Sequence, residues 1–293
     1  MEKQTQALPP KQNSLFTETW RRFRKNKTAL VGMVIVMFIV LLAIFADQLY
    51  DYETMAIKPN YDATLQPPSS EHYLGTDEFG RDVLARLIHG SRISLIVAVI
   101  SITVGTFIGS LFGAIAGYFG GIVDSIIMRI MDVFLAVPNM LLAITVVAAL
   151  GTSSVNLILA IAIAGMPRFA RIARASVLSV KSYEFIEAAK ANGASSWRII
   201  FEEVIPNSLA PIIVQYSIAL AGAILTISSM SFIGLGVQAP TPEWGAMLSN
   251  GRQYFKNSGY LIVFPGLAIA ITALAINLLG DGLRDALDPK LKQ

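Results

Sequence analysis

Residues 182–206 read SYEFIEAAKANGASSWRIIFEEVIP, the longest charged, amphipathic stretch between two strongly apolar runs of the chain. Its first half, 183–192, is predicted to be a helix, because Phe185, Ile186 and Ala189 recur at helical spacing on one side. Acidic and basic side chains lie three residues apart along a second, wet stripe. The stretch is therefore predicted to carry an amphipathic helix between two membrane spans.

A glycine corner and a second helix are predicted to follow. Gly193 stands where the first helix should end, since glycine adopts the left-handed conformation of a C′ residue at the lowest cost. Ser195 or Ser196 can then cap a short helix that includes Trp197. Pro206 lacks a backbone N–H, so it ends that helix or opens the next one. We expect a rigid pair of helices, called here the docking element (residues 182–206).

The composition indicates a membrane protein. Of 293 residues, 54% are hydrophobic and 15% are charged, whereas soluble domains carry about 25% charged residues. Cysteine is absent and histidine occurs only twice, which argues against a disulfide framework and against a thiolate or histidine-rich metal site. We therefore expect no metal on this chain.

The first apolar run predicts a membrane span. Residues 1–27 are polar and basic and are expected to anchor on anionic lipid at the membrane surface. Residues 28–46 are uncharged and, at about 1.5 Å per residue, long enough to cross a hydrocarbon core of about 30 Å. The run exceeds the apolar core of a signal peptide, and no A-x-A cleavage site ends it. Residues 47–90 are expected to form an acidic loop without regular structure, because prolines interrupt it.

Residues 91–281 are predicted to form the core of the protein, with five more spans. The second span covers 93–119, where glycine recurs at every fourth residue from Gly105 to Gly117. Such a face of small residues lets another helix approach closely in lipid. The charge-free stretch 133–167 is too long for one span, so we divide it at 151–154 into spans three and four.

The remaining boundaries complete an all-α, polytopic membrane protein with six transmembrane helices. Spans five and six cover 207–237 and 260–279, and residues 282–293 form a polar tail. Lysine and arginine concentrate in the N-terminal segment, in residues 168–198 and in the tail, but are sparse in the loops 47–90 and 238–259. Because positive charge marks the cytoplasmic side, both termini and the docking element are expected in the cytoplasm.

The sequence contains no motif for catalysis. It has no GxxxxGK[ST] phosphate loop, no HExxH and no G-x-S-x-G elbow, so we expect no catalytic residue. Asp124, Arg129 and Asp132 near the third span are expected to pair with one another or to line the cytoplasmic mouth, because they would be costly in contact with lipid. A membrane pump needs an energy source. A pump with neither a nucleotide site nor a charged relay must therefore take its energy from a partner.

A second charged cluster lies before the second span. Asp77, Glu78 and Asp82 could form a cation site, but Arg81 and Arg86 stand among them and can neutralise them. We interpret the cluster as a solvated face in which Asp82 pairs with Arg86, four residues later.

The docking element allows two interpretations. A stiff helix pair that continues into spans four and five can transmit a push, and Phe185, Ile186 and Trp197 suit a groove on a soluble partner. Alternatively, an amphipathic helix between two spans lies on the membrane surface. The residues alone leave both interpretations open.

Part of the docking element resembles a known motif. Glu187-Ala188-Ala189, then Gly193, and then the hydrophobic-proline pair Ile205-Pro206 resemble the EAA motif. That motif marks the membrane permease subunits of binding-protein-dependent ABC importers. The family usually has leucine where Ile205 stands, and an apolar or basic residue where Glu203 places a carboxylate. The resemblance implies that the docking element binds cytoplasmic ATPases, through Tyr183, Phe185, Glu187, Ala188, Ala189, Gly193, Trp197 and Pro206.

Motifs along almost the whole chain resemble the C-type permeases of dipeptide and oligopeptide ABC importers. They are LGTD at 74–77 with GRDVL at 80–84, GYFGG at 117–121, PTPEWG at 240–245 and GDGLRD at 280–285. The resemblance implies the type I importer permease fold in the inner membrane of a bacterium. It also implies a B-type permease partner, two cytoplasmic ATPase subunits that bind ATP and Mg²⁺, and an extracytoplasmic substrate-binding protein. No cofactor on this chain and no nucleic-acid partner are expected.

The resemblance makes small peptides the leading substrate, with nickel and glutathione as alternatives from the same subfamily. A path for varied peptides needs polar, uncharged contacts, and the candidates in the spans are Asn139, Gln215, Ser228, Ser229 and Ser231. Helix packing is the alternative role for these side chains. An ion-coupled secondary transporter would need embedded carboxylates or inverted repeats with broken helices. Spans two, four, five and six lack interior charges, which disfavours that class, and the missing Ser/His pairing disfavours an intramembrane enzyme.

Overall fold

The computed structural model describes residues 15–287. No strand forms within that range, where Thr76 and Asp82 make a single isolated antiparallel bridge. The predicted all-α class is confirmed. Most of the predicted N-terminal segment 1–27 and half of the tail 282–293 lie outside the described residues.

Thirteen α-helices follow one another along the described chain. They are α1 (Leu15–Phe23), α2 (Lys27–Ile44), α3 (Ala46–Leu49), α4 (Val83–Phe119), α5 (Gly121–Leu135), α6 (Asn139–Leu150), α7 (Ser154–Val180), α8 (Glu184–Ala191), α9 (Ser196–Arg198), α10 (Ile205–Asn207), α11 (Leu209–Phe232), α12 (Trp244–Gly251) and α13 (Tyr260–Leu287). Short π-helical turns form at Tyr52–Ile57 and Ile199–Val204, and 3₁₀ turns at Tyr61–Ala63 and Arg252–Tyr254.

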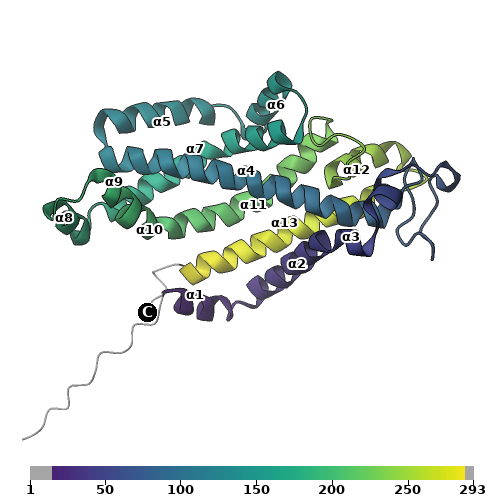
Figure 1. Cartoon of the computed structure of the whole chain (residues 1–293), viewed down its shortest axis with the longest axis horizontal. Helices are drawn as coiled ribbons and strands as arrows, with labels where there is room; N and C mark the ends of the chain where they lie inside the picture. Colours follow the sequence, from purple (N-terminus) through teal and green to yellow (C-terminus); the bar gives the residue numbers. More distant parts are fainter. Residues whose placement is uncertain (1–14, 288–293) are drawn as a thin grey trace, which may run out of the picture.

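The long helices lie side by side along the long axis of the molecule (Figure 1). Helices α8, α9 and α10 gather at one end, and α3 and α12 lie at the opposite end (Figure 1). We name these the coupling end and the outer end, after the role and the membrane side predicted for them from the sequence. Within residues 15–287, five helices are long and apolar enough to cross a membrane: α2, α4, α7, α11 and α13. The chain is therefore a multi-pass membrane protein.

The predicted third span is broken. Helices α5 and α6 meet at an angle of 88°. If this bent pair crosses the membrane as one broken span, it is the sixth span of the described chain. The break falls just before Pro138, which precedes the first residue of α6. Proline disfavours a helical conformation in the residue before it, so α5 ends there and the chain turns. The predicted division at 151–154 is confirmed, because α7 begins at Ser154.

The glycine face of the second span packs against α7. A Cβ atom on Gly105 would lie 2.8 Å from the carbonyl oxygen of Ala162, and one on Gly117 would lie 2.9 Å from that of Arg174. The two glycines between them face the same helix even more closely. Because these glycines have no side chains, the two backbones touch, as the spacing predicts, and the neighbouring helix is α7.

Helix α13 is longer than the predicted sixth span. It continues to Leu287, so that residues 282–287 of the predicted tail are helical, and it packs along α2. A Cβ atom on Gly32 of α2 would lie 2.6 Å from the carbonyl oxygen of Ala275. Asn26 caps α2 through its side-chain oxygen, and its amide nitrogen donates to Asp285 of α13 over 3.1 Å. These contacts fix the first span against the last.

The outer end contains more regular structure than the sequence predicts. Helix α4 begins at Val83, ten residues before the predicted second span, and Asp82 caps it by accepting the N–H of Ala85 over 2.8 Å. The predicted loop 238–259 contains α12, which Glu243 caps in the same way. Both caps are short polar signals within loops, so hydropathy alone does not reveal them.

Candidate functional site

The first helix of the docking element is α8, which ends at a glycine corner, as the sequence predicts. Gly193 has a φ of +75°, the left-handed conformation. Its N–H donates to the carbonyl of Lys190 over 2.9 Å, and the N–H of Ala194 donates to that of Ala189 over 3.1 Å. These two bonds form a complete Schellman motif, which satisfies carbonyls at the end of α8 and fixes the direction of the chain.

The second arm of the docking element is a continuous helical stretch from Ser196 to Asn207. Of the two predicted caps, Ser195 is the one used, since its hydroxyl accepts the N–H of Arg198 over 3.3 Å. The stretch loosens into the π-helical turn Ile199–Val204 before Pro206, which lies in the first turn of α10. Pro206 thus opens the last turn before α11, one of the two roles predicted for it.

Both arms are anchored on α4 and α7 by buried aliphatic side chains. Ile186 of α8 and Ile199, Ile200 and Val204 of the second arm are fully or almost fully buried. They form one cluster with three residues of the long helices, Ala114, Tyr118 and Val177. The ammonium of Lys181 also donates to the carbonyl of Tyr118 over 2.6 Å. The docking element is therefore a stiff extension of the spans.

The anchoring corrects one part of the predicted docking face. Ile186 was expected to point toward a soluble partner, but its side chain is completely buried against the protein's own spans. Phe185 and Trp197 keep the predicted exposure, with 37% and 52% of their surfaces accessible. The helical spacing of Phe185 and Ile186 does not separate the two roles, because adjacent residues lie about 100° apart on a helix.

The exposed surface of the docking element is aromatic and small. Tyr183 and Phe185 lie with ring centroids 5.8 Å apart, and Trp197 lies between the rings of Phe119 and Phe201, at 5.9 and 6.2 Å. Among the other predicted contact residues, Glu187, Ala188, Gly193 and Pro206 are exposed and Ala189 is half-buried. An exposed aromatic surface with small residues beside it is compatible with the predicted groove of a soluble partner.

Glu203 departs from the family pattern and stays without an ion pair in the described part of the chain. The salt bridge of this region joins Arg198 to its neighbour Glu202 over 2.7 Å. Glu203 is half-buried, and its backbone carbonyl accepts the side-chain amide of Asn207 over 2.6 Å. Its carboxylate therefore adds a second negative charge near Arg198, which already pairs with Glu202.

A charged cleft of about 500 Å³ lies between α5 and α7, toward the coupling end. Asp124 accepts two bonds from the guanidinium of Arg174, at 2.5 and 2.6 Å, and Asp132 accepts one from Arg171 over 2.7 Å. The predicted pairing of Asp124, Arg129 and Asp132 with one another is therefore wrong, because α7 supplies the partner charges. Arg129 lines the cleft without an ion pair in the described residues.

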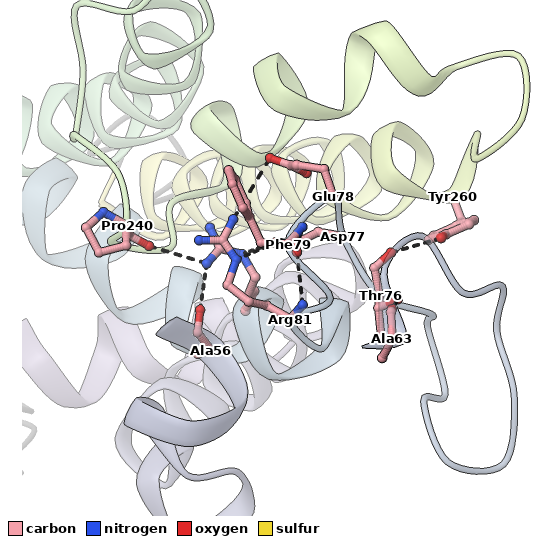
Figure 2. A network of polar contacts seen from close by, with 10 residues as sticks. Ala56, Ala63, Thr76, Asp77, Glu78, Phe79, Arg81, Pro240 and Tyr260 are labelled. Atoms are coloured by element: carbon pink, nitrogen blue, oxygen red, sulfur yellow. Dashed lines mark hydrogen bonds and ion pairs between the residues drawn. The ribbon is translucent and has the colours of Figure 1, made fainter. Parts of the chain in front are cut away.

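At the outer end, Asp77 is the centre of a buried charged network (Figure 2). Its carboxylate accepts the guanidinium of Arg81 over 2.7 Å and lies 3.3 Å from that of Arg86. Arg86 also donates to the carbonyls of Ala56, over 2.6 Å, and Pro240, over 3.3 Å. We call Asp77, Arg81 and Arg86 the outer network. It ties the loop 47–82 to α4 and to the segment before α12.

The outer network overturns the predicted solvated face. Asp77, Arg81 and Arg86 are each at most 6% exposed. Asp82 does not pair with Arg86, because capping α4 turns its carboxylate away, toward His72, whose Nδ1 lies 2.9 Å from it. The sequence predicts the mutual neutralisation of these charges but not their burial, which depends on the loop folding back over α4.

A second buried carboxylate holds α12 in place. Glu243 is completely buried and accepts the N–H groups of Gly245 and Ala246, at 3.0 and 2.9 Å, and the hydroxyl of Ser94 of α4, over 3.2 Å. Burial raises the pKa of Glu243 above its ordinary value, because the low dielectric disfavours the charged form. The indole N–H of Trp244 donates to the carbonyl of Leu87 over 2.9 Å, so α12 is fastened to α4 at two points.

The predicted pore residues do not gather on one surface. Asn139 is exposed at the start of α6, whereas Gln215, Ser228, Ser229 and Ser231 belong to α11. Ser228 and Ser231 are buried beside Gly245 and Gly236, where the chain packs closely, and the hydroxyl of Ser229 donates to the carbonyl of Leu225 over 2.8 Å. The burial of Ser228 and Ser231 is consistent with the alternative role in helix packing, although the hydroxyl of Ser228 makes no hydrogen bond within the described residues. The pore role of all five residues stays a prediction.

Among the described residues, no group of three histidine or carboxylate side chains could hold a metal ion. The absence of a metal and of a cofactor on this chain stays a prediction.

Two family models match the sequence. Residues 109–293 match the binding-protein-dependent transport system inner membrane component, and residues 14–68 match the N-terminal transmembrane domain of oligopeptide transport permease C. Together the two matches include the docking element and the first span.

Curated relatives are similar over almost the full length. A dipeptide transport system permease protein of Alkalihalophilus pseudofirmus is 45% identical over 279 residues, which cover 95% of this chain and 91% of the relative. A dipeptide transport system permease protein of Escherichia coli K12 is 46% identical over 94% of this chain and 93% of its own length. A glutathione transport system permease protein of Pectobacterium atrosepticum is 45% identical over 94% and 91%.

A solved structure shares the fold. A chain of the MetNI methionine ABC transporter in an inward-facing conformation aligns with a TM-score of 0.55 and 20% identity, over 69% of this chain and 96% of that chain. At that identity the likeness concerns the fold alone.

Proposed function

The chain belongs to the family of binding-protein-dependent transport system inner membrane components, and from this premise we propose how it works. It is a permease subunit of an ATP-driven ABC importer and forms half of a membrane pathway for dipeptides and other small peptides. The observation that carries the peptide substrate is the identity of 45–46% to dipeptide permeases over almost the whole chain.

The docking element is the part that receives the energy. A cytoplasmic ATPase subunit binds the exposed aromatic surface of Tyr183, Phe185 and Trp197, with Glu187 and Ala188 beside it. Because Ile186, Ile199 and Ile200 anchor the element on α4 and α7, a displacement of the ATPase moves these helices instead of bending a loop. Such rigid-body motion opens and closes the pathway in turn.

Each partner protein has a separate role. A second, B-type permease completes the pathway, two ATPase subunits bind ATP and Mg²⁺, and a substrate-binding protein delivers the peptide to the outer end. The positive charge of residues 168–198 supports a cytoplasmic location for the docking element and for both termini. The loop 47–82, which the outer network holds in place, and α12 then lie on the side of the binding protein.

The experiment that tests this function is reconstitution. The chain is purified with its B-type permease and two ATPase subunits, placed in liposomes, and supplied with the binding protein and labelled dialanine. We expect uptake that requires ATP and each partner. Uptake by this chain alone, driven by an ion gradient, would instead establish a secondary transporter.

Glutathione is the second candidate substrate, and one observation favours it. The glutathione permease from Pectobacterium is as identical to this chain as the dipeptide permease from Alkalihalophilus is. Glutathione is itself a tripeptide, so one pathway can accommodate both. Competition between labelled dialanine and unlabelled glutathione in the same liposomes distinguishes them: a dipeptide importer keeps its dialanine uptake at equimolar glutathione.

A further inference from the structure

Helix α5 lies at the edge of the helix bundle and adds nothing to its apolar core. It contacts α4 and α7 and runs beside them from the coupling end (Figure 1). Of its fifteen residues only Met131 is buried. No residue of α5 belongs to the three clusters of buried apolar side chains in residues 15–287, whereas α4 and α7 each contribute several. Packing therefore holds α5 less firmly than it holds the helices beside it.

The chain can bend at the start of α5. Gly120 and Gly121, the residues at this start, have φ angles of +68° and +56°. Glycine reaches such conformations readily, and nothing lies within 4 Å of the place where a Cβ atom would be at either residue. No side chain caps the first turn of the helix. Two small residues in open space can absorb a change of φ and ψ, as the residues of a hinge do.

The chain bends again at the end of α5. The helix axis turns by 88° into α6, and the three residues at the turn, Ala136, Val137 and Pro138, are all exposed. Helix α6 is itself fixed in the core, because Ala143 and Val147 are completely buried there. Helix α5 is thus a stiff segment between two bends, with a firmly packed helix on either side.

Two ion pairs hold α5 against α7 across the charged cleft. Asp124 accepts two bonds from Arg174, and Asp132 accepts one from Arg171. Within residues 15–287, no other hydrogen bond or ion pair joins a side chain of α5 to another helix. The Asp132 and Arg171 side chains are 46% and 56% exposed, and exposed ion pairs contribute little stability individually. We call the two pairs the latch.

We propose that α5 swings as one body about its two bends, and that the latch holds it against α7 in the position seen here. When the latch opens, the cleft of about 500 Å³ between the two helices widens, and water solvates the four charges that the pairs release. The inference goes beyond the proposed function and rests on it only for the force that moves the helix.

The docking element contacts the chain just before the first bend. The ring of Trp197 lies 5.9 Å from that of Phe119, the last residue of α4, and Lys181 donates to the carbonyl of Tyr118. A displacement of the docking element by the ATPase therefore moves the end of α4 and the bend that follows it. Helix α7 moves with the docking element, because buried side chains join the two. Helix α5 lacks that anchorage, so the relative displacement falls on the latch.

In the rival account, a neighbour in the membrane covers α5 and keeps it fixed. Its outward side chains, such as Ile122 and Val133 at 79% and 65% exposure, then lie against lipid or against the B-type permease. The two accounts differ in what is measured. A fixed α5 keeps one distance to α7 in every state of the importer, whereas a hinged α5 adopts two.

The test measures the distance between α5 and α7 in the reconstituted importer. The chain has no cysteine, so spin labels are attached at Ser125→Cys and Ala175→Cys, two exposed positions, with partner subunits whose cysteines have been replaced. We expect one distance without nucleotide, and a second, longer one when ATP hydrolysis is stopped with vanadate. Labels at the exposed Phe112 and Leu178, on α4 and α7, are the control and should keep one distance. A single distance between positions 125 and 175 in both states overturns the proposal.

A second measurement tests the latch itself. Asp124→Asn and Asp132→Asn are combined, and Asp47→Asn is the matched control because it removes the ion pair with Arg92 at the outer end. Without nucleotide, we expect the neutral latch to raise the ratio of the longer to the shorter distance at least about threefold, as for two partly exposed ion pairs. The control should leave the ratio unchanged. An equal ratio in both variants contradicts the latch.

Reversed charges separate the loss of the latch from poor folding. Asp132→Arg alone should raise the same ratio, and its combination with Arg171→Asp should lower the ratio again, because the pair re-forms with opposite polarity. A double variant that stays at the ratio of the single variant overturns the role of this pair. If the unmodified importer takes up no dialanine, the proposed function fails, whereas the neutral and reversed variants still test the latch without nucleotide.

Discussion

At Gly193 the chain adopts a φ of +75°, and nothing lies within 4 Å of the place where a Cβ atom would be. A substitution there acts through backbone strain alone, without a clash. For a residue with a side chain, the left-handed conformation costs about 1–2 kcal/mol. The corner between the two arms therefore depends on glycine, although the site has room for any side chain.

We expect Gly193→Val to leave the protein in the membrane but to separate ATP hydrolysis from transport. The Schellman bonds weaken, the corner relaxes, and the stroke of the ATPase is absorbed before it reaches α7. The ratio of dialanine transported to ATP hydrolysed should fall at least fivefold, by about 1 kcal/mol of coupling. Gly193→Asn is the control, since asparagine tolerates the left-handed conformation best. Normal coupling in the valine variant would show that a rigid corner is unnecessary.

Burial of Glu243 allows a prediction of how the stability of the protein depends on pH. Its ordinary pKa is 4.5, and burial raises the pKa in the folded protein. The folded state thus holds its proton more tightly than the unfolded state. The contribution to stability is complete below pH 4.5 and is lost as the pH rises from there through the raised folded pKa. We expect the apparent Tm of the complex to fall over this range, and Glu243→Gln to flatten that fall.

A second carboxylate variant separates the effect of Glu243 on stability from the effect of pH on the other carboxylates. Glu53→Gln, at an exposed position in the outer loop, should reproduce the pH profile of the unmodified protein. A profile for Glu243→Gln that is parallel to that of the unmodified protein would mean that the pKa of Glu243 is the same in the folded and the unfolded state.

The helices themselves could mostly be predicted from the sequence, because hydropathy and helical spacing act over many residues. The division at 151–154, the docking element and its glycine corner rest on such local signals. The break between α5 and α6 is not predicted, because residues 133–150 are uncharged throughout, although Pro138 marks the place. Helix α12 is not predicted, because it is only eight residues long and begins two residues after Pro242.

The glycine face of α4 allows a prediction about the stability of helix packing. A Cβ atom on Gly113 would collide with the backbone of α7, whereas one on Gly222 of α11 meets nothing within 4 Å. We expect Gly113→Ala to destabilise the protein by about 1–3 kcal/mol through overpacking, and Gly222→Ala to leave it unchanged. Heat-induced aggregation of the detergent-purified chain measures both. Equal midpoints for the two variants would show that α4 and α7 do not pack as closely as described.

For the whole molecule, the sequence motifs predicted the family and the fold, but not how the charges are arranged. Asp77, Arg81 and Arg86 lie within a few residues of one another, yet their burial depends on a loop that returns from Ala56 and on a carbonyl at Pro240. The partners of Asp124 and Asp132 come from α7, more than 35 residues away along the chain. Contacts between distant segments of this kind leave no periodic signal in a sequence.

The whole account depends on a rigid element that binds an ATPase and moves the spans. Ala188 is exposed on α8, on the far side from the buried Ile186. A photo-crosslinking residue is placed there in the assembled importer, with the same residue at exposed Tyr73 of the outer loop as the control. We predict a crosslink from position 188 to the nucleotide-binding ATPase subunit, with a yield that changes when ATP is added, and none from position 73. Crosslinks from position 188 to lipid alone, in a complex that still imports dialanine, would contradict the account.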